Sequence, residues 1–165
     1  MTIFSGIALV SFLASQSATT IPSEALCEVA EIKNRRELHY ALSRRAVDAI
    51  NLAAASDPAL AGLIAPTATF SLGSGDVGRP LGLGAIGAHL LTREMKADTF
   101  RFPGWDYMLL PIDNPCAVHK VDVEFLNTPK KNIFRVTFTF EAGRIVDASG
   151  WTRSYESGPV TPVLD

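Results

Sequence analysis

The stretch 132-NIFRVTFTFE-141, followed by Ala142-Gly143 and 144-RIVDASGWTRSY-155, decides the fold. Apolar and polar side chains alternate along its first segment, which is typical of a β-strand with one buried face. The Glu141-Ala142-Gly143 junction is short and contains glycine, so the two segments are predicted to form a hairpin. We therefore expect two long antiparallel strands whose apolar sides face a common core.

Two further segments before this hairpin, 99–110 and 116–126, also have strand-like compositions. Asn127-Thr128-Pro129-Lys130 is a turn signal that leads from the second of them into the hairpin. The four segments predict a meander of antiparallel strands. In segment 116–126 the side facing the core is mostly apolar and contains Ala117, His119, Val121, Val123 and Phe125.

Helical periodicity dominates the earlier part of the chain. Apolar residues recur every three or four positions from Leu38 to Ala53, which predicts one helix, with a break near Asn34. Asp57-Pro58 is a strong start signal for a short second helix, because aspartate caps and proline fits the first helical position. A short strand is expected at 67–72 and a third helix at 83–96. Helices and strands that are segregated along the chain predict an α+β fold.

Length and charge limit the possible functions. The 165 residues suit one domain with a real core. The net charge is −2, from 15 basic and 17 acidic residues, so the basic excess expected of a nucleic-acid-binding protein is absent. No nucleic-acid partner is expected.

The first twenty residues carry no charged side chain, and residues 3–14 form an apolar run. This run is too short to span a membrane but matches the hydrophobic part of a secretory signal. We expect a signal peptide at 1–20, a domain at 21–157, a loose tail at 158–165 and a periplasmic or secreted location. The alternative is an N-terminal segment of a cytoplasmic protein. Export would permit a disulfide between Cys27 and Cys116, which are otherwise two separate thiols.

Four stretches resemble, in their order and spacing, the nuclear transport factor 2-like superfamily in its SnoaL-like branch. They are Ser56-Asp57-Pro58, 63-LIAPTATF-70, 82-GLGAI-86 and 138-FTFEAGRIV-146. The resemblance implies a cone-shaped fold in which three N-terminal helices pack on a strongly curved mixed or antiparallel sheet and enclose a pocket. It also implies a homodimer through the sheet.

This superfamily contains isomerases, dehydratases, epoxide hydrolases, polyketide cyclases and binding modules, so the resemblance implies no single activity. Members like ketosteroid isomerase carry an acidic base in the first strand, after an Ala-Thr-apolar step. Placing Ala68-Thr69-Phe70 on that step puts Leu72 or Ser71 at the position of the acid. Neither residue can serve as a carboxylate base, so that chemistry is not expected.

His119 is the main candidate for chemistry, because its strand position directs it toward the presumed pocket. It is expected to act as a general base or to hydrogen-bond a ligand, and the alternative is a core histidine satisfied by a backbone carbonyl. Asp48, at the edge of the first helix's apolar stripe, is a candidate partner for His119. The alternative is an Arg45–Asp48 ion pair or an exposed Asp48.

Aromatic residues and one arginine are the candidate ligand contacts. The alternative for the aromatic side chains is ordinary packing. Arg153 could hold a carboxylate with its planar guanidinium, or form an ion pair on the surface or at an interface. The ligand-binding candidates are Trp105, Tyr107, Phe134, Phe138, Trp151 and Arg153.

No cofactor or metal is predicted. The three histidines lack metal-site spacing, and neither G-x-G-x-x-G match, at 73–78 or 82–87, belongs to a βαβ unit. Two functional hypotheses remain. The first is a pocket that binds a small apolar molecule. The second is a cofactor-free lyase, isomerase or hydrolase that uses His119 with Asp48 or a tyrosine such as Tyr40.

Overall fold

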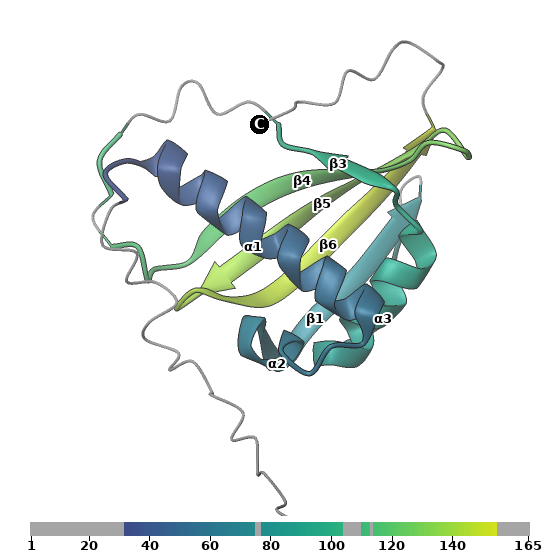
Figure 1. Cartoon of the computed structure of the whole chain (residues 1–165), viewed down its shortest axis with the longest axis horizontal. Helices are drawn as coiled ribbons and strands as arrows, with labels where there is room; N and C mark the ends of the chain where they lie inside the picture. Colours follow the sequence, from purple (N-terminus) through teal and green to yellow (C-terminus); the bar gives the residue numbers. More distant parts are fainter. Residues whose placement is uncertain (1–31, 75–76, 104–109, 113, 155–165) are drawn as a thin grey trace, which may run out of the picture.

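A computed structural model describes residues 32–74, 77–103, 110–112 and 114–154. The predicted signal segment 1–20, Cys27 and the predicted tail 158–165 lie outside these residues. The described residues form three helices and six strands (Figure 1). In chain order they are α1 (Arg35–Ala55), α2 (Leu60–Leu63), β1 (Ile64–Ser74), β2 (Val77–Leu83), α3 (Gly84–Met95), β3 (Thr99–Arg101), β4 (His119–Asn127), β5 (Asn132–Glu141) and β6 (Arg144–Ser154).

The six strands form one sheet in the order β2-β1-β6-β5-β4-β3. β4, β5 and β6 are joined as antiparallel hairpins, as predicted. β1 pairs with β6 in parallel, so the sheet is mixed rather than purely antiparallel. The sheet curves around α1, and the helices cover one side of it (Figure 1). The predicted α+β class is confirmed.

We call the helix-covered side of the sheet the inner face and the opposite side the outer face. Strand alternation assigns Phe134 and Phe138 to the inner face, together with their cross-strand neighbours Phe125 and Val121. Arg135 and its neighbours on either side, Glu124 and Trp151, belong to the outer face. The core therefore lies between the inner face and the helices.

Local signals explain where α1 begins and ends. The side chain of Asn34 accepts a hydrogen bond from the N–H of Glu37 at 3.0 Å, so Asn34 is the N-cap of the helix. Ser56, with φ 55°, ends it in a left-handed conformation. Asp57 then caps the turn before α2 by accepting from the N–H of Ala59 at 2.8 Å. The short second helix starts later than predicted, at Leu60.

Two predicted strands are shorter in the structure. β3 covers only the first three residues of the predicted 99–110 strand, and Pro103 follows it closely. β4 starts at His119 rather than at Cys116, because the residues before it form a turn. In that turn the side chain of Asn114 accepts from the N–H of Cys116 at 2.9 Å. A side chain that bonds the local backbone in this way competes with strand pairing.

β2 was not predicted from the sequence. Its seven residues, VGRPLGL, include two glycines and Pro80, which weaken every strand signal. Such a strand is tolerated at the edge of a sheet, which is where β2 lies.

The glycines of segment 82–87 serve packing between α3 and the sheet. Gly84 has φ +51°, and a Cβ there would lie 2.6 Å from the carbonyl oxygen of Pro66. A Cβ at Gly87 would lie 2.6 Å from the carbonyl oxygen of Gly82. This close backbone approach accounts for a G-x-G-x-x-G match without any nucleotide.

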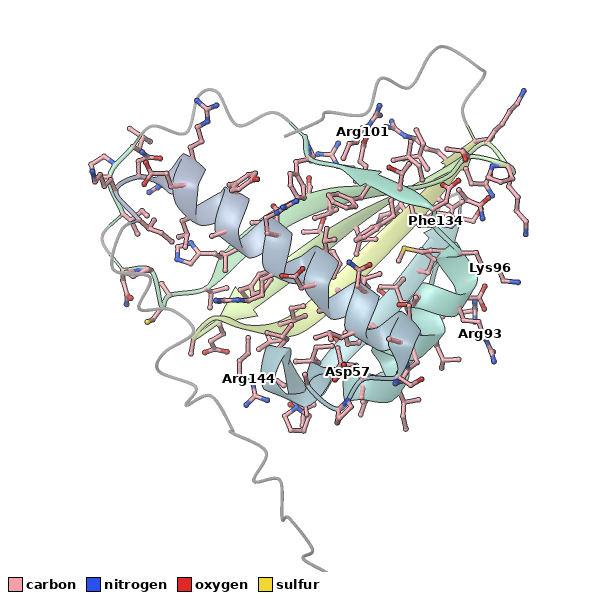
Figure 2. All side chains as sticks on the ribbon, viewed as in Figure 1. Asp57, Arg93, Lys96, Arg101, Phe134 and Arg144 are labelled. Atoms are coloured by element: carbon pink, nitrogen blue, oxygen red, sulfur yellow. The ribbon has the colours of Figure 1, made fainter. Side chains whose placement is uncertain are left out.

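Arg144 on β6 connects α2 to the sheet through hydrogen bonds. Its Nη2 donates to the carbonyl oxygens of Ala61 and Ile64, each at 2.8 Å. Figure 2 shows Arg144 beside α2. The guanidinium thus satisfies carbonyls at the end of a helix too short to be stable alone.

Candidate functional site

Two histidines meet where α1 crosses the start of β4. The ring centroids of His39 and His119 are 6.5 Å apart, and their planes are inclined by 71°. Both side chains are partly buried. His119 therefore faces α1 from the inner face of the sheet, as the strand alternation predicted.

His119 is oriented by the turn that precedes its strand. Its Nε2 lies 3.0 Å from the carbonyl oxygen of Asn114. A carbonyl can only accept, so we assign the proton of this contact to Nε2. In the neutral ring, Nδ1 is then left as an acceptor. His119 thus bonds a backbone carbonyl, which was the alternative given for it from the sequence. Its Nδ1 can still accept a hydrogen bond.

His39 has no hydrogen bond to any residue that the structure describes. Its pKa is lowered from 6.5 mainly by burial, and then by the nearby positive charges of His119 and Arg35. The ring is therefore mostly neutral at pH 7 and offers both a donor and an acceptor nitrogen.

His39 belongs to a line of polar residues on the inward side of α1. Arg35, His39 and Ser43 are spaced by four residues, so they lie on one helical face. We call these three residues the α1 polar stripe. Arg35 is exposed, His39 is partly buried and Ser43 is completely buried, with a relative exposure of 0%. The Oγ of Ser43 has no hydrogen-bond partner among the described residues.

Aromatic side chains are neighbours of His119 and of the adjacent part of α1. Phe140, 1% exposed, is the cross-strand neighbour of His119. Tyr40 on α1 makes an edge-to-face contact with Phe102 at 5.7 Å, and Phe102 contacts Phe100 at 5.4 Å. Aromatic side chains thus lie beside His119 and Tyr40. The hydroxyl of Ser43 is fully buried, where an unpaired hydroxyl is costly.

The structure does not bring Asp48 to His119. Asp48 is exposed and lies nine residues beyond His39 on α1, which is about 13 Å along the axis and on the opposite side of the helix. It interacts electrostatically with Arg45, whose Nη1 donates to the carbonyl oxygen of Gly143 at 3.3 Å. These contacts favour the Arg45–Asp48 alternative.

The predicted ligand contacts fall into three groups. Phe134 and Phe138 are buried on the inner face, with exposures of 4% and 0%. Trp151 and Arg153 lie on the outer face, away from His119. Trp151 is 43% exposed, and Arg153 Nη2 forms an ion pair with Glu124 Oε1 at 2.9 Å. Trp105 and Tyr107 lie outside the described residues.

Sequence reasoning missed His39 and Ser43. Both interrupt the apolar stripe of α1 and therefore count as polar positions in a periodicity test. Projected at 100° per residue, however, both lie within the arc occupied by Leu38, Leu42 and Val47. The signal that could have identified them is a polar residue inside the apolar arc of an amphipathic helix.

The described ranges contain no group of three or more side chains that could hold a metal ion. Within the same ranges, no helix is long and apolar enough to cross a membrane. Cys116 is disulfide-bonded, and the only other cysteine of the chain, Cys27, lies outside the described residues.

Sequence comparisons find no matching family model and no matching curated protein. Solved structures do match. A "putative ketosteroid isomerase" from Kribbella flavida DSM 17836 is 17% identical, with a TM-score of 0.45, over 78% of this chain and 91% of that one. An NTF-2-like protein of unknown function from Burkholderia xenovorans LB400 is 15% identical, with a TM-score of 0.44, over 74% of this chain and 91% of that one.

The Burkholderia structure is described as NTF-2-like. A de novo designed NTF2 fold protein also matches, with 15% identity and a TM-score of 0.37 over 68% of this chain and 85% of that one. Likenesses this distant carry no activity over to this chain, so its function is inferred from its own residues.

Proposed function

We propose that the protein binds a small, largely apolar molecule in a pocket between α1 and the inner face of the sheet, with His39 and His119 as its polar contacts. The observation that carries this proposal is the His39–His119 pair, whose ring centroids lie 6.5 Å apart between α1 and the start of β4. Ligand-binding sites typically have mostly apolar walls and a small number of polar groups that point toward the ligand.

We further propose that the protein is exported and forms a homodimer through the outer face of the sheet. The disulfide at Cys116 supports export, because such bonds persist in oxidising compartments. The exposed Trp151 on the outer face supports a protein contact there, because tryptophan is enriched at interfaces. Native mass spectrometry of protein secreted by its host would report the mature start, the disulfide and the oligomeric state together.

Titration with Nile red, a neutral apolar dye, tests the pocket. Wild-type protein is expected to bind the dye saturably with a blue-shifted emission. The substitution His39→Trp places a larger ring at the α1–β4 crossing and should weaken binding about tenfold. Thr137→Val, on the outer face, is the control and should leave binding unchanged. Absence of saturable binding to the folded wild type would refute the pocket.

A second function, cofactor-free acid–base catalysis, is favoured by the contact between His119 and Asn114. A backbone carbonyl that fixes Nε2–H leaves Nδ1 ready to accept a proton from a substrate. The partner in this scheme is His39, since Asp48 lies on the far side of α1. The reaction would be that of a lyase, isomerase or hydrolase.

Proton exchange tests this chemistry. Wild-type protein in D2O should accelerate deuterium uptake at the carbon next to the carbonyl of cyclohexanone, as followed by NMR. His119→Gln should abolish the acceleration while retaining the fold. Equal rates in the wild type and the variant would leave ligand binding as the function.

A further inference from the structure

The α1 polar stripe runs from solvent into the interior of the protein. Arg35 is exposed at the first turn of α1, His39 is partly buried, and Ser43 is fully buried. Eight residues of helix separate the ends of the stripe, a distance of about 12 Å. The stripe therefore offers a cationic group at the surface and a hydroxyl at depth, with two imidazoles near its middle.

The cationic end of the stripe has no carboxylate partner in the described part of the chain. The guanidinium of Arg35 forms no ion pair there, whereas Arg79 and Arg101 each contact a glutamate. The nearest acid on α1, Glu37, accepts from the N–H of Lys33 and from the side chain of Asn34. It also points away from the stripe, because it is two residues from Arg35.

The buried end of the stripe also lacks a partner. Ser43 is 0% exposed and its Oγ has no hydrogen bond, although buried hydroxyls in proteins are nearly always satisfied. A hydroxyl left unpaired beside apolar side chains costs folding free energy. A polar atom of a ligand that reaches this depth would recover that cost.

We propose that the ligand of this site, given the binding function proposed above, is an amphiphilic monocarboxylate whose apolar body carries a second polar group. The carboxylate lies at Arg35, whose planar guanidinium can donate two parallel hydrogen bonds to it. The apolar body follows α1 inward past His39 and His119. The second group, a hydroxyl or a carbonyl, bonds to the Oγ of Ser43.

The charge of the ligand can be tested by competition. At pH 7.5, decanoate and decanol, each below its aggregation limit, displace Nile red from the full-length protein. Decanoate is expected to displace the dye at a concentration about tenfold lower than decanol. Arg35→Gln should remove this preference without changing the displacement by decanol. Arg93→Gln should keep it, because Arg93 is an exposed arginine on α3, far from the start of α1 (Figure 2).

The outcomes separate this inference from the proposed function. If decanol and decanoate displace the dye equally from the wild type, the carboxylate assignment is wrong and the apolar pocket stands. If Nile red does not bind at all, the pocket itself is wrong. If Arg93→Gln removes the preference as fully as Arg35→Gln does, the selectivity reflects overall charge and the assignment to Arg35 fails.

The deep contact has its own probe, 10-hydroxydecanoate, which adds a hydroxyl at the far end of decanoate. It should displace the dye at a lower concentration than decanoate from the wild type. Ser43→Ala should reduce its affinity to that of decanoate and leave decanoate unchanged. An equal advantage of 10-hydroxydecanoate in the wild type and Ser43→Ala would exclude Ser43 from recognition.

NMR titration of the histidine rings gives a readout that does not depend on displacement. Decanoate should raise the pKa of His39, because a bound carboxylate offsets the repulsion from Arg35 and His119. Decanol should leave that pKa where it is. A His39 pKa that does not respond to decanoate at saturation would place the anion elsewhere.

Discussion

The outer face of the sheet and the α1 polar stripe use similar polar residues in opposite ways. On the outer face, the buried carboxylate of Glu124 contacts Arg101 at 2.5 Å and Arg153 at 2.9 Å. On the inner side, Arg35, His39 and Ser43 make no such contacts with the described residues. Polar groups that satisfy one another maintain architecture, whereas unsatisfied polar groups facing a core are available to a ligand. Further pairs on the outer face are Arg135–Asp122, Thr137–Asp122 and Thr69–Asp147.

The largest effect should come from the apolar part of the inner face. Phe138 is 0% exposed and packs against Phe125 with ring centroids 6.2 Å apart. Phe138→Ala is expected to lower the free energy of unfolding by about 3–5 kcal/mol, because it removes a buried ring and leaves a cavity. Urea denaturation measures this. Trp151→Ala, on the outer face, is the control, and a loss as large as that of Phe138→Ala would contradict the assignment of the core.

The second-largest effect on stability should come from the ion pairs of Glu124 on the outer face. Glu124→Gln removes the charge that Arg101 and Arg153 share and should cost about 1–2 kcal/mol. The loss should shrink in high salt, because the arginines are partly exposed. Glu94→Gln is the control, since its bridge to Arg79 is exposed on both sides and should be worth under about 0.5 kcal/mol. Equal losses in the two variants would show that burial of Glu124 does not matter.

Removing one hydroxyl from the α1 polar stripe and one from the outer face should change stability in opposite directions. Ser43→Ala deletes an unpaired buried hydroxyl and should raise the free energy of unfolding by up to about 1 kcal/mol. Thr137→Val breaks the bond to Asp122 at 2.6 Å and should lower it by about 1 kcal/mol. Thermal and urea denaturation of both variants measure the sign of each change in the free energy of unfolding. A destabilised Ser43→Ala would mean that its hydroxyl is paired in solution.

The smallest effect is a dependence of stability on pH. The pKa of His39 is lower in the folded protein than its ordinary value of 6.5, so below that pH the unfolded chain binds more protons. Stability is therefore expected to fall as the pH drops below 6.5. Urea midpoints measured between pH 7.5 and 5.5 report the slope, and His39→Gln should flatten it. An unchanged slope would assign the dependence to other groups.

Much of the fold followed from short-range patterns. The predicted 132–141 strand coincides with β5, and the third helix differs from α3 by one residue at each end. These elements combine strong periodicity with clear turn signals, so their limits are set locally. β2 escaped prediction because edge pairing with β1, a tertiary interaction, overrides its glycines and proline.

The candidate site was harder to predict. Strand alternation placed His119 correctly, because the side-chain period of a strand is rigid. Its neighbour His39 comes from a helix 80 residues away in sequence, and only the crossing of α1 over β4 brings the two together. Trp151 and Arg153 belong to the outer face, which strand composition alone does not distinguish from the inner one.

The composition of β2 has a consequence for self-association. An open sheet edge exposes backbone groups onto which another chain can add a strand and begin a fibre. β2 contains Pro80 and two glycines and carries the charged Arg79, which makes it a poor template. Edge-to-edge polymerisation is therefore disfavoured at this edge of the sheet.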